Sequence, residues 1–143
     1  MITSLTAADR PRWTELWRGY LVFYETALPD EIYDATWNRL MQDRGLHGFG
    51  LRHDGELVGL VHYLFHESAW TLTQICYLQD LFIDPAARGT GGGRTLIEAV
   101  AGAARARDAA KMYWLTQSHN ATARRLYDRL AKHRGFIRYD YPL

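Results

Sequence analysis

The sequence predicts an α/β (α+β) fold in which helices cover the faces of a mixed β-sheet. Strand-like runs and amphipathic helical segments alternate along all 143 residues, with no linker and no low-complexity segment. Hairpin-forming strands come first, and a strand–helix–strand–helix–strand series follows. This order is typical of a sheet that combines antiparallel and parallel pairing.

The first expected elements are a short strand and two helices. Residues 2–6 form a strand-like run. From 7 to about 26 the apolar side chains recur at helical spacing, at Trp13, Leu16, Trp17, Tyr20, Leu21 and Tyr24. A second helix is expected to begin at Pro29-Asp30-Glu31, because acidic residues suit the positive N-terminal end of a helix dipole.

Three strands are expected in the middle of the chain. Residues 48–52 and 57–65 flank Asp54-Gly55, a dipeptide typical of a hairpin turn. A longer strand is expected over 71–83. These segments predict two hairpins in succession.

The remaining elements alternate between helix and strand. A helix is expected over 92–107, with apolar residues on one side at Leu96, Ile97, Val100 and Ala104. A strand over 111–116 and a helix over 120–132 follow. Gly135 marks the end of that helix, and a last strand is expected over 136–141.

Composition and charge limit the function classes. A chain of 143 residues suits one domain, residues 1–143, with a core that needs no disulfide. Its 17 basic and 16 acidic residues give a net charge of +1, which argues against a nucleic-acid-binding protein. One cysteine, no long apolar run and no secretory pattern predict a cytoplasmic protein that does not span or bind a membrane.

The most informative stretch is a glycine cluster between a strand and a helix. It consists of Arg88, Gly89, Thr90, Gly91, Gly92, Gly93 and Arg94. Glycines let the backbone approach a ligand, and a helix start offers unpaired N–H groups and a positive dipole end. The stretch therefore predicts a phosphate or pyrophosphate cradle. It fits neither the P-loop nor the Gly-x-Gly-x-x-Gly dinucleotide fingerprint, so a nucleotide-phosphate enzyme is the least favoured class.

A second motif lies further along the chain. Asn120-x-x-Ala123-x-x-Leu126-Tyr127 is followed by Gly135-Phe136. Together with the Arg88-x-x-Gly91-x-Gly93 loop, this motif resembles the signatures of the GNAT superfamily of N-acyltransferases, from about Leu57 to the C-terminus. The neighbouring segments Tyr77–Ile83 and Phe136–Tyr139 resemble the branch of polyamine, thialysine and small histone acetyltransferases.

The resemblance implies a mostly antiparallel central sheet with helices on both faces, and acetyl-CoA as cosubstrate. In the family, the strand containing Leu81, Phe82 and Ile83 binds the pantetheine arm with its splayed backbone. The loop from Arg88 to Arg94 takes the pyrophosphate. Asn120 and Ala123 belong to the cofactor site, and Tyr127 protonates the leaving thiolate. Asn120 and Tyr127 are seven residues apart, so they share a helix face. Taken alone, Asn120 also suits a helix N-cap and Tyr127 a packed core.

The general base is the weak point of the resemblance. The related branch often carries Glu-Asp on the central strand, whereas this chain has Gln79-Asp80, and an amide cannot accept the proton. Adjacent strand residues point to opposite faces, so Asp80 replaces the missing acid only if a bulge turns it. Asp80 is the predicted base, and the other candidates are Glu25, His62, His66 and Glu67.

No metal site is expected from the sequence. His62 and His66 are separated by an even spacing on a strand and share a face, but a metal needs more ligands. Cys76 lies in a buried-looking strand without a His/Asp pattern around it, so it is interpreted as a core residue.

The acceptor is expected to be a small-molecule amine. Aromatic residues beside carboxylates suit a cation, and the predicted substrate-binding residues are Tyr24, Glu25, Trp70 and Gln79. The favoured function is transfer of an acetyl group from acetyl-CoA to a polyamine or amino-acid derivative. The alternatives are acetylation of a protein lysine or N-terminus, and a non-catalytic acyl-CoA-binding module. A homodimer is expected, because the family is often dimeric.

Overall fold

The computed structural model describes residues 1–143 and contains one five-stranded sheet in the order β1-β2-β3-β4-β5. The strands are β1 (Ile2–Ser4), β2 (Leu46–His53), β3 (Glu56–His66), β4 (Ile75–Ile83) and β5 (Lys111–Tyr113). The helices are α1 (Arg10–Phe23), α2 (Asp30–Gln42), α3 (Gly92–Ala106) and α4 (Ala121–Leu130), with short 3-10 turns at Ala7–Asp9 and Pro85–Ala87. All pairings are antiparallel except the parallel pairing of β4 with β5.

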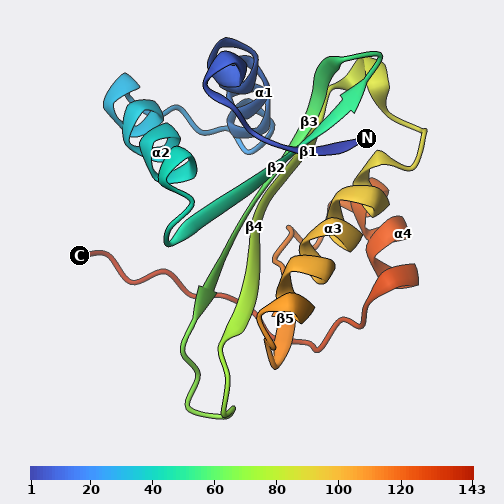
Figure 1. Cartoon of the computed structure of the whole chain (residues 1–143). Coiled ribbons are helices and arrows are strands. Elements are labelled where there is room, and N and C mark those ends of the chain that lie inside the picture. Colours follow the sequence, from blue (N-terminus) through green and yellow to red (C-terminus); the bar gives the residue numbers. More distant parts are fainter.

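The helices cover both faces of the sheet, as Figure 1 shows: α1 and α2 on one face, α3 and α4 on the other. The predicted mixed α/β fold with a mostly antiparallel sheet is thereby confirmed. The central strand β3 alternates between the two layers, since Leu60 packs in the α1/α2 core and Val61 in the α3 core. None of the helices is long and apolar enough to cross a membrane.

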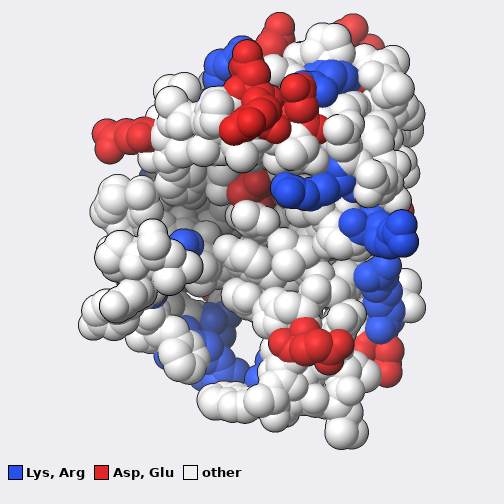
Figure 2. All heavy atoms as spheres, turned by 90° about the vertical axis from the view of Figure 1, so that its left-hand side faces the viewer, with Lys and Arg blue, Asp and Glu red and all other residues white.

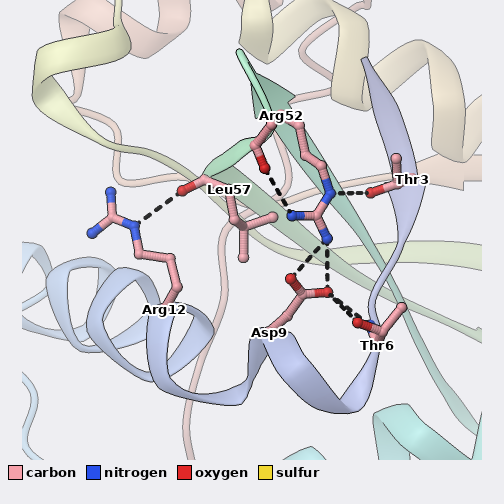
Figure 3. A network of polar contacts seen from close by, with 7 residues as sticks. Thr3, Thr6, Asp9, Arg12, Arg52 and Leu57 are labelled. Carbon is pink, nitrogen blue, oxygen red and sulfur yellow. Dashed lines mark hydrogen bonds and ion pairs between the residues drawn. The ribbon is translucent and has the colours of Figure 1, made fainter.

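The N-terminal elements are tied to the sheet by a polar network around Arg52, drawn in Figure 3. The Arg52 guanidinium contacts both carboxylate oxygens of Asp9, at 2.7 and 2.8 Å, and donates to Thr3 Oγ1 at 3.0 Å. The Thr6 backbone N–H also donates to Asp9, at 2.8 Å. Burial alone would raise the pKa of Asp9, but these hydrogen bonds outweigh it and hold the pKa below its usual value.

Strand β4 has an irregular register at its centre. His62 of β3 pairs with Asp80, whereas the next residue, Tyr63, pairs with Leu78, so Gln79 is an extra residue on β4. This is a β-bulge, which bends a strand and re-aims its side chains. Because of it, Leu78 packs in the α3 core while Asp80 lies buried against Trp17 of α1.

The last strand expected from the sequence is wrong. Residues 131–143 contain neither helix nor strand, and beyond Ala131 their backbone makes no hydrogen bond. Phe136, Ile137, Tyr139 and Tyr141 are exposed. A strand forms only with a neighbour that accepts its backbone hydrogen bonds, and this tail runs past the sheet without pairing (Figure 1).

Three other strands are shorter than expected, and the one expected over 2–6 ends at Ser4. The strand expected over 71–83 begins at Ile75, and the one expected over 111–116 ends at Tyr113. In both cases the missing residues lie where no neighbouring strand pairs with them, so the apolar pattern of the sequence continues beyond the ladder.

Candidate active site

The site is built around a split between β4 and β5. The two strands pair only from Ile75 to Tyr77 and from Lys111 to Tyr113, and then they separate. Residues 78–83 of β4 therefore have a neighbour on the β3 side alone. Their other backbone edge offers N–H and C=O groups to a ligand that carries amides, as an added strand would.

A small cavity of about 20 Å³, the junction cavity, lies at this split. Its lining consists of Tyr20, Tyr24, Leu78, Gln79, Leu81, Trp114, Leu115 and Tyr127. A larger cavity of about 400 Å³, the α1–α4 cavity, lies between the end of α1 and the start of α4. Its lining consists of Phe23, Tyr24, Glu25, Gln117, His119, Asn120, Ala121 and Thr122. Tyr24 lines both cavities, so they are neighbours.

Figure 2, which looks onto the α1/α2 face, shows a hollow with mostly uncharged walls, acidic atoms at its upper edge and basic atoms below it. In the α1–α4 cavity Glu25 is the single acidic side chain. Glu25 has φ +54°, a left-handed backbone conformation that is uncommon for a non-glycine residue and often found at functional sites.

Tyr127 of α4 is held at the junction cavity by aromatic packing. Its ring packs edge-on against Trp114, with 5.4 Å between the centroids. Burial, with a smaller contribution from Tyr24, raises the pKa of Tyr127 to about 12. The phenol therefore keeps its proton at neutral pH and can serve as a proton donor.

Asn120 stands at the N-cap position of α4 but its side chain does not cap the helix. Its Nδ2 donates instead to Thr116 Oγ1 at 3.1 Å. This bond orients the amide at the wall of the α1–α4 cavity and leaves the carbonyl oxygen available to a ligand.

The glycine loop has two kinds of glycine. Gly89 and Gly91 have φ of +86° and +83° and open space where a Cβ would lie. At Gly92, in contrast, a Cβ would lie 2.6 Å from Leu51 Cδ2, so this glycine lets α3 pack closely on the sheet. The first helical backbone bond runs from the Thr95 N–H to the Gly91 oxygen, and three N–H groups precede it. The free N–H groups, the open loop and the dipole suit an anion such as a phosphate or pyrophosphate.

The arginines of this loop contribute less directly. The Arg88 side chain points back to the end of β4, where Nε donates to the Ile83 oxygen at 3.0 Å and the guanidinium lies over the Phe82 ring. Arg94 is paired with Glu98 at 2.9 Å. The loop therefore offers backbone N–H groups rather than these two side chains as its unpaired donors at the helix start.

Asp80 lies beneath α1. Its Oδ2 accepts hydrogen bonds from Trp17 Nε1 at 3.2 Å and from His62 Nδ1 at 2.8 Å. Tyr20, which lines the junction cavity, donates from its hydroxyl to the Gln79 oxygen at 3.4 Å. Burial raises the pKa of Tyr20 far above its usual value, and the neighbouring Asp80 carboxylate adds to the increase.

The structure brings together most, but not all, of the residues expected from the sequence. Gln79, Leu81, Tyr24 and Tyr127 meet at the junction cavity, and Glu25 and Asn120 line the α1–α4 cavity. The remaining cofactor-site residues lie nearby on the loop and on strand β4, while Ala123 of α4 lines neither cavity.

Trp70 does not join the site. It is 81% exposed in the turn between β3 and β4, with Lys111 over its ring. Two candidate bases, His66 and Glu67, lie near the same end of the sheet. The His66 ring contacts the Tyr113 hydroxyl and the backbone oxygen of Glu67. Neither His66 nor Glu67 lines the junction cavity or the α1–α4 cavity.

Several residues that line the two cavities were not expected at the site, among them Trp114 and Leu115. The sequence predicts a strand through both, but they lie just beyond the end of β5 and line the junction cavity. The available signal was the aromatic residue directly after a short strand. No group of three or more His, Cys, Asp or Glu side chains is placed to hold a metal ion.

The geometry just described agrees with comparisons to known proteins. Residues 11–132 match the model of the acetyltransferase (GNAT) family. The D-amino-acid N-acetyltransferase of Saccharomyces cerevisiae is 31% identical over 134 residues, which cover 92% of this chain and 83% of the yeast protein.

Solved structures share the fold over the full length. The ribosomal-protein-alanine N-acetyltransferase from Brucella melitensis biovar Abortus 2308 has a TM-score of 0.80 at 24% identity, covering 100% of this chain and 99% of its own. AAC(6')-Iy, in complex with the bisubstrate analogue CoA-S-monomethyl-acetylneamine, has a TM-score of 0.87 at 17% identity, covering 100% and 97%. At these identities the likeness shows a common fold.

Proposed function

Because the chain belongs to the acetyltransferase (GNAT) family of acyltransferase enzymes, we propose that it transfers an acetyl group from acetyl-CoA to a primary amine of a small molecule. The observation that carries the proposal is the junction cavity. There the unpaired edge of β4 and the protonated Tyr127 meet, next to the α1–α4 cavity.

Different elements of the site are proposed to bind different parts of acetyl-CoA. The free N–H groups at the start of α3 suit the pyrophosphate, and the open edge of β4 suits the amide-bearing pantetheine arm. Asn120 offers a carbonyl oxygen to the same arm. Acetyl-CoA supplies an activated thioester, and the backbone N–H groups of β4 beyond Tyr77 are positioned to stabilise negative charge on its carbonyl oxygen.

Tyr127 is proposed as the general acid. It would give its phenolic proton to the thiolate sulfur, along a hydrogen bond from its hydroxyl to that sulfur, as the carbon–sulfur bond breaks. The contact with Trp114 restricts the orientation of the Tyr127 ring, so the hydroxyl is already in place before the reaction.

The acceptor is proposed to be amino-acid-like or polyamine-like. The α1–α4 cavity, at about 400 Å³, has room for a small molecule and combines two aromatic rings, Phe23 and Tyr24, with the carboxylate of Glu25. The similarity to a yeast enzyme that is a D-amino-acid N-acetyltransferase favours the amino-acid class over the polyamine class.

The test is release of CoA thiol from acetyl-CoA with a panel of D- and L-amino acids, polyamines, aminoglycosides and a histone-tail peptide, against a control without acceptor. We expect release with one class of small amine. Release with the peptide alone would replace the proposal by protein acetylation. Binding of acetyl-CoA without release for any acceptor would contradict it.

We also propose a homodimer held by the C-terminal tail. Phe136, Ile137, Tyr139 and Tyr141 are each at least 74% exposed, and no segment of the same chain covers them. A second copy is the simplest partner for so much apolar surface. Light scattering after size-exclusion chromatography should give a dimer for the full chain and a monomer when residues 133–143 are deleted. A full-length monomer would contradict this proposal.

A further inference from the structure

A buried chain of polar contacts joins α1, β3 and β4 beneath the site. Trp13 Nε1 donates to His62 Nε2 at 2.9 Å, His62 Nδ1 lies 2.8 Å from Asp80 Oδ2, and Trp17 Nε1 donates to the same oxygen. His62 is 1% exposed and Asp80 8%. Polar groups so deeply buried are costly unless every contact is satisfied, which makes this chain a specific feature of the fold.

The contacts determine where the proton of His62 lies. An indole N–H can only donate a hydrogen bond, so His62 Nε2 must be the acceptor and carry no proton. The neutral imidazole then has its proton on Nδ1, which donates to Asp80 Oδ2. A proton on Nε2 would face the Trp13 N–H across 2.9 Å, and therefore His62 is not free to act as the base.

The same contacts occupy one oxygen of Asp80. Oδ2 accepts from both His62 and Trp17, and neither of them contacts Oδ1. The Tyr20 hydroxyl also lies within hydrogen-bonding reach of the Asp80 carboxylate. The Asp80 side chain is 11% exposed, so it is not sealed from solvent. Beside Asp80 stands Tyr20, whose ring lines the junction cavity.

The bulge at Gln79 is what makes this arrangement possible. In a regular strand, position 80 would share a face with Leu78, which packs in the α3 core. With the extra residue Gln79, Asp80 instead comes opposite His62 and beneath Trp17. The bulge thus transfers the carboxylate to the α1/α2 face of the sheet, where its two donors are.

We infer that His62 is a positioning residue for a catalytic Asp80: Trp13 fixes the neutral imidazole, the imidazole and Trp17 hold Oδ2, and Oδ1 accepts the proton of the acceptor ammonium. This inference rests on the proposed acetyl transfer. The proton passes from the ammonium to Oδ1 directly, or through water beside Tyr20, and the neutral amine then attacks the thioester carbonyl.

The protons balance over the reaction. The ammonium loses one proton to Asp80, which returns it to solvent after turnover. The nitrogen loses a second proton as the amide forms, and this one replaces the proton that Tyr127 gives to the thiolate. The products are the acetylated amine, CoA thiol and one released proton.

Few other charged or titratable groups lie around the His62–Asp80 pair. The titratable groups on the elements packed around it are Tyr20 of α1, Tyr33 of α2, which packs edge-on against Trp17, and Tyr77 of β4. The Arg10 guanidinium lies over the Trp13 ring, 5.9 Å from its centroid.

The kinetic test compares the pH dependence of kcat/KM in four variants. His62→Leu removes the donor to Oδ2, and a carboxylate without that donor holds its proton more tightly. The acidic limb should therefore move to higher pH and kcat should fall about tenfold. His62→Asn, which keeps an N–H donor at that end, should restore most of the rate. Asp80→Asn should remove the acidic limb. Trp37→Phe, a buried tryptophan that packs on Trp13 but makes no hydrogen bond to His62 or Asp80, should leave it in place.

A second measurement needs no activity. The ¹⁵N shifts of the imidazole rings, assigned with His62→Asn, should show His62 as the Nδ1–H tautomer, and Trp13→Phe should abolish this preference. Turnover by the unmodified enzyme tests the proposed function separately. If turnover occurs but the limb is unmoved in His62→Leu, or if His62 is the Nε2–H tautomer, the inference is overturned.

Discussion

The two faces of the sheet bury side chains of different chemistry. Against α3, the core is almost entirely apolar, with Leu96, Ile97 and Val100 packed on Val61 and Ile83. Against α1, indole rings enclose the carboxylate of Asp80 and the imidazole of His62. Apart from His47, which is buried against Tyr63 and hydrogen-bonded to Asp43, the α3 face needs only shape and area, whereas the α1 face must also satisfy each polar atom. Changes to the first should alter stability, and changes to the second should also alter chemistry.

The largest effect on stability is expected from Leu96→Ala on the α3 face. Leu96 is fully buried, and removing its side chain should cost about 2–5 kcal/mol of the free energy of unfolding. Urea denaturation measures the loss, and kcat per folded molecule should be unchanged. Equal losses in stability and in kcat would show that the apolar face is also part of the chemistry.

Tyr127→Phe should have the largest effect on turnover. Removing the phenolic proton should lower kcat about 100-fold, with little change in the KM for acetyl-CoA. Tyr139→Phe in the exposed tail is the matched control and should leave both constants unchanged. An unaltered kcat in Tyr127→Phe would remove this residue from the mechanism.

Two glycines of α3 test whether close packing against the sheet decides stability on this face. In Gly92→Ala the new methyl would lie 2.6 Å from Leu51 Cδ2 and 2.9 Å from Ile83 Cδ1, so the protein should lose about 1–3 kcal/mol. In Gly102→Ala the methyl meets nothing within 4 Å, and the helix should gain about 0.5–1 kcal/mol. Thermal unfolding of both variants measures the difference, and opposite signs are the expected result.

The smallest effect concerns pH and the Arg52 network. The pKa of Asp9 lies below its unfolded value, so its contribution to stability is complete above that unfolded pKa and is lost as the pH falls through the folded one. Asp9→Asn should therefore cost about 1 kcal/mol near neutral pH and less in acid. Urea unfolding at several pH values tests this, and a cost that does not change with pH would argue against the linkage.

Local sequence patterns predict most of the fold. Helical spacing predicts α1 and α3, and the Asp54-Gly55 turn places β2 beside β3. The expected strand at 136–141 is wrong because its apolar residues resemble a strand whether or not a neighbouring strand is present. Pairing is a property of two segments, and a pattern along one segment does not contain it.

The candidate site also has parts that local sequence patterns predict and parts that they do not. The glycine loop, Asn120 and Tyr127 belong to short motifs, and the structure places them around one split in the sheet. The bulge at Gln79 depends on the register with β3, and the Trp13–His62 contact joins residues 49 positions apart. Both depend on contacts between distant segments, which neighbouring residues do not reveal. The expectation that Trp70 joins the site is wrong for the same reason, because Trp70 lies exposed in the turn between β3 and β4.

The most direct test of the account is transfer of isotope-labelled acetyl from acetyl-CoA to a small amine, followed by mass spectrometry for the unmodified enzyme and Tyr127→Phe side by side. The account predicts an N-acetylated amine, formed one for one with CoA thiol, at a rate that falls about 100-fold in the variant. Thiol release without an acetylated amine, or equal rates in the two proteins, would contradict it.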